Sequence, residues 1–345
     1  MSSNLHIRWA EARDNRAILE LLGQVAVKTP KESYALQRQP DCFALTQYQG
    51  QDCKIIVAEV KEQIRGLICV AMDHAFWDGG IRKVAYSSEL RVHPQARGQG
   101  LGEALQKASI ETAFTLAGPE LAFFNTVDVQ NPVGMRMNRY LAQANLVNMQ
   151  ELTQVRTYFW STLFSGIHGN NKFHYRDAQP QDLNQMSAIW QTLASRRQLA
   201  RAYTDPWLAN TRLPPIQKWI VAESQQEILG FIGIWDQRAY RQILLPESPF
   251  WMGLLGAQAG VPLPIAFGTH LCVRPEARAC LPGLIEQAIL SSRQMNLKFL
   301  ALALDQQDPL NEWLAQRVGN SGLMYLLGNQ IPRKAQVFQL EMAFG

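Results

Sequence analysis

Residues 90–102 have the sequence LRVHPQARGQGLG, and residues 271–278, LCVRPEAR, repeat the pattern of their first eight positions. In both stretches the alternation of apolar residues predicts a β-strand that ends at a proline. Two further pairs of matching stretches lie upstream in the same order: residues 56–59 (IVAE) with 220–223 (IVAE), and residues 7–10 (IRWA) with 175–178 (YRDA). Three ordered matches indicate that the chain consists of two copies of one domain.

The break between the copies is expected at the Gly/Asn-rich stretch of residues 166–171, which predicts domains at 1–167 and 168–345. The first copy shows strand and helix patterns in alternation, which is typical of a mixed α/β fold. The predicted elements are a hairpin of residues 54–60 and 66–72, a strand at 85–92, a helix at 102–117, a strand at 121–127 and a closing strand at 155–164. In the second copy the closing strand is expected at residues 336–344.

Composition excludes several classes of function. The 345 residues are 47% hydrophobic and 18% charged, with a net charge of +4 and no block of like charge, so a nucleic-acid partner is not expected. The five cysteines form no C-x-x-C pair, which predicts free thiols in a reducing compartment and no metal site. Residues 1–10 have no apolar segment, and no apolar run is long enough to span a bilayer. We therefore expect a cytoplasmic protein without a membrane partner.

The glycines at 98, 100 and 102 lie where the strand ending at Pro94 meets the predicted helix. Their spacing allows a tight turn whose N–H groups, together with the start of the helix, favour a pyrophosphate. The spacing is G-x-G-x-G rather than the G-x-G-x-x-G of dinucleotide-binding proteins, and Gly102 is followed by Glu103, where a P-loop has Lys and then Ser or Thr. By itself this turn is also compatible with a plain strand-to-helix connection.

Arg-x-x-Gly-x-Gly directly after a Leu-x-Val-x-Pro strand resembles motif A of the GNAT (GCN5-related N-acetyltransferase) superfamily. The resemblance covers residues 7–164 and, more weakly, the second copy. It implies two tandem domains, each with a mixed, mostly antiparallel sheet flanked by helices, and acetyl-CoA or another acyl-CoA as co-substrate. The residues that it assigns to this co-substrate are Leu90 and Val92 through their main chain, Arg97, Gly98, Gln99, Gly100, Leu101 and Gly102 around the pyrophosphate, and Asn131 beside the pantetheine. Asn131 precedes Pro132, so it is also a plausible helix cap.

The catalytic positions depart from the family pattern. Many family members carry a tyrosine seven residues after the equivalent of Asn131, but this chain has Asn138. Strand alternation places Tyr86, Ser88, Leu90 and Val92 on one face, so a water held near Tyr86 and Ser88 is the expected base. The same alternation turns Glu89 to the other face, which predicts a structural ion pair.

The second copy has lost the glycine turn, because Leu281 and Pro282 replace residues that should approach a phosphate. It also contains a long insertion, residues 236–267, expected either to pack or to cover an acceptor pocket. In the first copy, residues 28–43 are expected to form a helical region on the acceptor side.

The predicted function is transfer of an acetyl or other acyl group from coenzyme A to a primary amine of a small molecule or peptide, by direct attack. The alternatives are a non-catalytic acyl-CoA-binding or sensor protein and an aminoacyl-transferring relative of the Fem type. The intact turn of the first copy argues against the Fem type.

Overall fold

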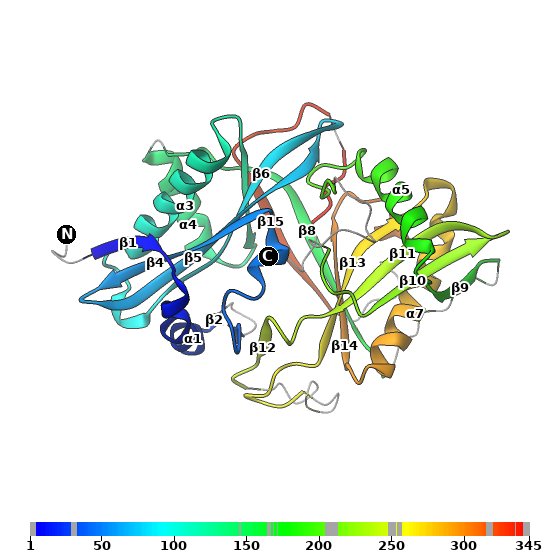
Figure 1. Ribbon diagram of the computed structural model, residues 1–345, viewed down its shortest axis with the longest axis horizontal. Helices are drawn as coiled ribbons and strands as arrows, with labels where there is room; N and C mark the ends of the chain where they lie inside the picture. The colour runs from blue at the N-terminus through cyan, green and yellow to red at the C-terminus, as the bar shows by residue number, and fades with distance from the viewer. Residues whose placement is uncertain are drawn as a thin grey trace.

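The computed structural model describes residues 5–28, 33–144, 146–163, 167, 169–170, 172–203, 213–247, 253, 257–314, 320–334 and 336–340. A continuous twisted sheet of 12 strands runs through the molecule, with helices on both faces (Figure 1). In sheet order the strands are β1 (Leu5–Trp9), β4 (Asp52–Val60), β5 (Gln63–Trp77), β6 (Gly80–Val92), β7 (Ala122–Asp128), β15 (Asn320–Gly328), β8 (Gln150–Ser161), β14 (Phe299–Asp305), β13 (Ile265–Val273), β11 (Glu227–Asp236), β10 (Lys218–Ser224) and β9 (His174–Asp177).

The sheet has the same arrangement when followed inward from either edge. β1, β4, β5 and β6 are joined by antiparallel pairing, as are β9, β10, β11 and β13. A parallel pair follows on each side, β6 with β7 and β13 with β14. The mixed α/β class and the mostly antiparallel sheet are therefore as the sequence predicted, including the hairpin that joins Val60 to Gln63.

One ion cluster is present twice. In each half an arginine on the first strand binds an acid near the start of the first helix and a glutamate on the next strand. The members are Arg8, Asp14 and Glu59 in the first half and Arg176, Asp182 and Glu223 in the second. The Nη1 to Oδ2 distance is 2.6 Å in both arginine–aspartate pairs. The repeat in the sequence thus has a counterpart in the side-chain contacts, whereas a domain boundary at 167/168 stays a prediction.

The helices divide between the two halves. α1 (Asn15–Gln24) covers one face of the first half, while α3 (Leu101–Ala117) and α4 (Pro132–Gln143) cover the other; α5 (Asp182–Ala194) and α7 (Leu281–Gln294) do the same in the second half. The short helices are α2 (Thr46–Gln49) and α8 (Asn311–Leu314), with 3-10 turns at Ala12–Asp14, Pro94–Ala96 and Pro275–Cys280. α3 ends at Gly118, in the left-handed region at φ 92°, as the Gly-Pro pair predicted.

Among the described residues no helix is both long and apolar enough to cross a membrane.

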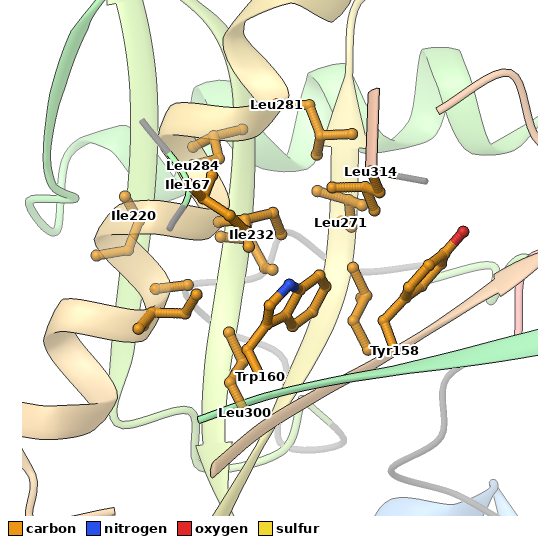
Figure 2. Close-up of a cluster of buried hydrophobic side chains, with 14 of the residues drawn as sticks. Tyr158, Trp160, Ile167, Ile220, Ile232, Leu271, Leu281, Leu284, Leu300 and Leu314 are labelled. Atoms are coloured by element: carbon orange, nitrogen blue, oxygen red, sulfur yellow. The ribbon is translucent and has the colours of Figure 1, made fainter. Parts of the chain in front are cut away.

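The two halves exchange strands at the centre of the sheet. β15 pairs with β7 on one side and β8 on the other, and β8 in turn pairs with β14. As a result, Tyr158 and Trp160 of β8 lie in the core of the second half, in one cluster with Leu281 and Leu284 of α7 (Figure 2). Neither half therefore completes its own sheet.

Two predicted elements differ. Residues 28–43, expected to be helical, contain β2 (Val27–Lys28) and β3 (Ser33–Gln37), because β3 pairs with β12 (Gln242–Leu244) of the second half and so has a strand partner that local sequence cannot reveal. The closing strand of the second half is β15 rather than residues 336–344. Of those residues, 336–340 form no strand but an isolated β-bridge, Gln198 with Phe338, and 341–344 lie outside the described residues.

Replacing Trp160 tests the exchange of β8. Trp160 is 3% exposed and Trp313 is 39% exposed. We expect Trp160→Ala to lower the free energy of unfolding by about 3–5 kcal/mol, since a large buried side chain is lost. Trp313→Ala, the matched control, should change it by less than about 1 kcal/mol. Urea titration measures both, and equal small effects would contradict a core role for β8 in the second half.

Candidate active site

A β-bulge in β6 sets the geometry of the site. Opposite β5, the pairing runs Leu67 with Arg91 and then Cys69 with Ser88, so that two residues of β6 face one of β5. Glu89, at the bulge, has a φ of 55°, in the left-handed region that a non-glycine residue seldom adopts. The bulge therefore reverses the alternation of side chains along the rest of the strand.

This reversal corrects the predicted faces. Leu90 and Val92 pack toward α3, in the cluster with Leu101 and Leu105, whereas Tyr86 lies on the other face. Glu89 lies on the face opposite α3, next to Cys69 and Arg38. The expectation that Tyr86, Ser88, Leu90 and Val92 share a face is wrong, because the inserted residue shifts the period of two by one position.

Beyond the bulge β6 separates from β7. Their parallel pairing ends at Ser87 with Asn125, although β6 continues to Val92 and β7 to Asp128, and all of these residues are described. At the start of the separation the Tyr86 hydroxyl and Thr126 Oγ1 are 2.7 Å apart and share a hydrogen bond. The main-chain groups of residues 88–92 on this side do not pair with β7, so an extended ligand could pair with them.

The glycine turn lies at the end of β6. Gly98 and Gly100 have φ values of 76° and 80°, and α3 begins at Leu101. An added Cβ at either glycine would meet nothing within 4 Å, so glycine is required by backbone conformation and not by crowding. Residues 97–100 are exposed, which leaves the N-terminal end of α3 open to an anion.

The predicted catalytic residues lie in different surroundings. Ser88 is half-buried beside the bulge, and burial raises the pKa of Tyr86, whose ring also packs on Phe124. Asn138 is buried; its Nδ2 donates to the Gly134 carbonyl (3.1 Å) and its Oδ1 accepts from Asn125 Nδ2 (3.0 Å). These bonds attach α4 to β7, so both ends of the amide are already in use.

Asn131 caps α4, since its Oδ1 accepts a hydrogen bond of 3.0 Å from the Gly134 N–H. This is the helix-cap role that the sequence left open beside a contact with pantetheine. Asn131 lies three residues beyond Asp128, the last residue of β7, in the turn between that strand and α4.

The structural ion pair predicted for Glu89 is confirmed, but its partner Arg38 and its burial at the bulge were missed from the sequence. Arg38 Nε lies 3.0 Å from Glu89 Oε2, and Arg38 also donates to the Cys42 carbonyl at 3.0 Å and to Gln49 Oε1 at 3.1 Å. The exposed fractions are 1% for Arg38, 9% for Glu89 and 5% for the nearby Arg241. Burial alone would raise the pKa of the Glu89 carboxyl, but the charges of Arg38, Arg241 and Arg91 outweigh it and lower that pKa. Glu89 is therefore a carboxylate at neutral pH.

The nearby cysteines are unreactive in this environment. Burial raises the pKa of both the Cys42 and the Cys69 thiols to about 12, despite the adjacent Arg38. Neither is a thiolate at neutral pH. In the part of the chain that the structure describes, His, Cys, Asp and Glu side chains form no group of three or more that could hold a metal ion.

In the second half the equivalent opening is filled by the chain itself. β13 carries a bulge with His270 at φ 51°, and its pairing with β14 ends at Phe267 with Ala301. The Phe338 N–H donates to Asp305 Oδ2 (2.7 Å) and Gln339 Nε2 to the Leu271 carbonyl (3.2 Å), which places this segment over the opening. The position of the lost glycine, Leu281, is fully buried in the core.

Comparisons with known proteins agree with this geometry. Residues 23–138 match the model of the Acetyltransferase (GNAT) family. A search of curated proteins with the sequence found no match.

Among solved structures, the chain is similar to N-myristoyltransferase of Saccharomyces cerevisiae with bound myristoyl-CoA (TM-score 0.64, 13% identity, 96% of this chain and 85% of that one). It is also similar to a GCN5-related N-acetyltransferase from Sphaerobacter thermophilus (TM-score 0.59, 12% identity, 100% of both chains). A GCN5-related glucosamine N-acetyltransferase region of a fungal β-N-acetylglucosaminidase is a third (TM-score 0.64, 13% identity, 95% of this chain and 38% of that one). At these identities the likeness establishes the fold.

The Arg38–Glu89 ion pair makes the stability depend on pH. The pKa of Glu89 is lowered in the folded protein. The stabilisation that the ionised Glu89 carboxylate gives to the folded protein is therefore complete above the ordinary glutamate pKa, about 4.3. It is lost as the pH falls through the lowered pKa of Glu89 in the folded protein. We expect Glu89→Gln to destabilise the protein by about 3–5 kcal/mol at pH 7, because buried guanidinium groups lose their anion. The difference in free energy of unfolding between Glu89→Gln and the parent protein should become smaller at pH values below the ordinary glutamate pKa.

Glu120→Gln is the matched control, since Glu120 pairs with Arg82 at 3.4 Å on the exposed surface. Urea titrations at several pH values measure the free energy of unfolding of all three proteins. A Glu89→Gln effect that stays constant down to the lowest pH would refute the ionised pair.

Proposed function

We propose that this chain, whose residues 23–138 match the GNAT acetyltransferase family, transfers an acetyl or other acyl group from coenzyme A to a primary amine of a small molecule or peptide. The observation that carries the proposal is the opening between β6 and β7 beyond Ser87, which leads to the exposed glycine turn at the start of α3. An extended arm that ends in a pyrophosphate matches both features.

The residues present fit such a co-substrate. β6 does not pair with β7 at Leu90 and Val92, so their main-chain groups can pair with the pantetheine arm as an added strand would. The Leu90 and Val92 carbonyls accept from Arg91 Nη1 (3.0 Å) and Arg97 Nε (3.4 Å), and each carbonyl retains a second lone pair. Arg97 through Gly102 supply N–H groups and positive charge to the pyrophosphate. Asn131 lies on the β7 side of the opening, where its main chain and amide can contact the arm. When bound, the co-substrate supplies an activated acyl group on a thiol that leaves readily.

The chemistry proposed is direct attack. The amine nitrogen bonds to the acyl carbon, the carbon–sulfur bond breaks, and the proton of the amine leaves with a base. Glu89, as a buried carboxylate on the same strand as Tyr86 and Ser88, holds the amine N–H, and water beside Tyr86 and Ser88 takes the proton. The sulfur leaves as a thiolate and takes a proton from solvent; since its conjugate thiol has a pKa near that of cysteine, about 8.5, it leaves with little assistance, and Asn138 need not act as an acid.

Asn138 has instead a positioning role in this proposal. Its bonds to Gly134 and Asn125 fix the start of α4 against β7, and so fix one wall of the opening.

Gly100→Leu tests the pyrophosphate site. Gly118 is the matched control, because it also has a positive φ (92°) and open space around an added Cβ. Leu strains the left-handed backbone of Gly100 (φ 80°, ψ 7°) by about 1–2 kcal/mol and that of Gly118 (φ 92°, ψ 171°) by about 1–3 kcal/mol, but only Gly100 lies in the turn. We expect Gly100→Leu to weaken acyl-CoA binding by at least about tenfold in calorimetry, since phosphate oxygens lose N–H partners. Gly118→Leu should bind normally, and equal affinities for the two variants would contradict this site.

Direct attack predicts that no acyl group becomes attached to the protein. After incubation with radiolabelled acyl-CoA without amine, the denatured protein should retain no label, because the buried Cys42 and Cys69 thiols are protonated. With an amine present, release of coenzyme A thiol should rise with pH as the amine loses its proton. Label trapped on the protein would overturn direct attack. Tight cofactor binding with no turnover of any amine would favour the non-catalytic sensor.

A further inference from the structure

Asn125 lies at the closed end of the opening between β6 and β7. It is the last residue of β7 that pairs with β6, opposite Ser87, and the two strands separate beyond it. Its side chain is 5% exposed and is bonded to Asn138 of α4. Ser87 Oγ in turn donates to Gln106 Oε1 of α3 at 3.4 Å. The side of the closed end that faces α3 and α4 therefore holds buried polar side chains.

The hydrogen bonds of two asparagines determine which atom of Asn125 remains available. The Gly134 carbonyl can only accept, so Asn138 must turn its Nδ2 toward it, at 3.1 Å. Asn138 Oδ1 then faces Asn125, which must present its own Nδ2, at 3.0 Å. The remaining atom, Asn125 Oδ1, is buried and accepts no hydrogen bond from the described residues. What this atom lacks is a hydrogen-bond donor.

The second half shows that the fold does not require a polar residue at this position. In each half, the residue three positions before the bulge residue pairs with the neighbouring parallel strand, and the next residue of that strand is Asn125 in the first half and Leu302 in the second. Leu302 is 2% exposed and lies in the apolar cluster that includes Leu284 of α7. A buried oxygen without a donor is costly, and an apolar side chain avoids this cost. The unpaired oxygen of Asn125 therefore indicates that a ligand supplies the donor.

We propose that Asn125 Oδ1 accepts a hydrogen bond from the amide N–H of acyl-CoA that is nearest the sulfur. This inference rests on the acyl-CoA binding proposed above. With the pyrophosphate at residues 97–102 and the arm along residues 88–92, the sulfur end of the arm is directed toward the closed end at Asn125. The amide that is separated from the sulfur by two carbon atoms is then the nearest strong donor, because a thioester has no proton to donate and a thiol is a weak donor. Asn125 is thus a binding residue that sets how deeply the acyl group enters the opening.

The test replaces one group of the ligand. An acetyl-CoA analogue with an ester oxygen in place of this N–H presents a lone pair to Asn125 Oδ1. We expect the parent protein to bind the analogue more weakly than acetyl-CoA by on the order of 10- to 100-fold in calorimetry, because two acceptors face each other. In Asn125→Ala, the ratio of the two dissociation constants should fall to within about threefold, as a double-mutant cycle requires for a direct contact. Asn125→Leu, which copies the side chain of Leu302, is a second variant with the same expected ratio.

Asn329→Ala is the matched control, because Asn329 Oδ1 accepts from the Phe123 N–H of β7 at 2.8 Å, away from the opening. It should keep the full ratio of the parent protein. Since the ratio is taken within one variant, it separates a ligand contact from the structural effect of losing the bond to Asn138. Equal affinity of the parent protein for acetyl-CoA and the analogue, or a ratio in both Asn125 variants as large as in the parent, would overturn the inference while acyl-CoA binding stands. If acetyl-CoA itself does not bind, the proposed function fails.

Discussion

The ion pair between Arg38 and Glu89 holds the site together. Glu89 occupies a strained position in β6, and the buried guanidinium keeps its side chain on the face opposite α3. The bulge at this residue separates β6 from β7, and Arg38 connects the bulge to β3, which in turn pairs with β12 of the second half. One buried contact thus links the opening for the co-substrate, the acceptor side and the arrangement of the halves.

The two halves share a framework and use it differently. Both carry a bulge, at Glu89 and His270, followed by a separation of parallel strands. In the second half the opening is covered by residues near Phe338, and Leu281 replaces a glycine with core packing. Since β8 and β15 are exchanged between the halves, each half completes the sheet of the other, and Arg241 of the second half is one of the charges that act on Glu89.

Local patterns in the sequence predicted the local structure. The hairpin after Val60, the end of α3 at Gly118 and the tight glycine turn before α3 follow from turn and helix rules that act within a few residues. The bulge could not be predicted, because a single extra residue in β6 leaves an unbroken strand pattern and yet exchanges the faces of Glu89 and Leu90. The strand character of residues 33–37, the exchange of β8 and the Arg38–Glu89 pair all depend on partners distant in sequence.

Amide hydrogen exchange with and without acyl-CoA tests the central claim, that the opening beyond Ser87 takes the extended arm of the co-substrate. The account predicts that binding slows exchange at residues 88–92 of β6 and at 98–104 around the start of α3, while residues 268–273 of β13 are unchanged. Slower exchange at β13, or none at residues 88–92 despite saturating acyl-CoA, would contradict it.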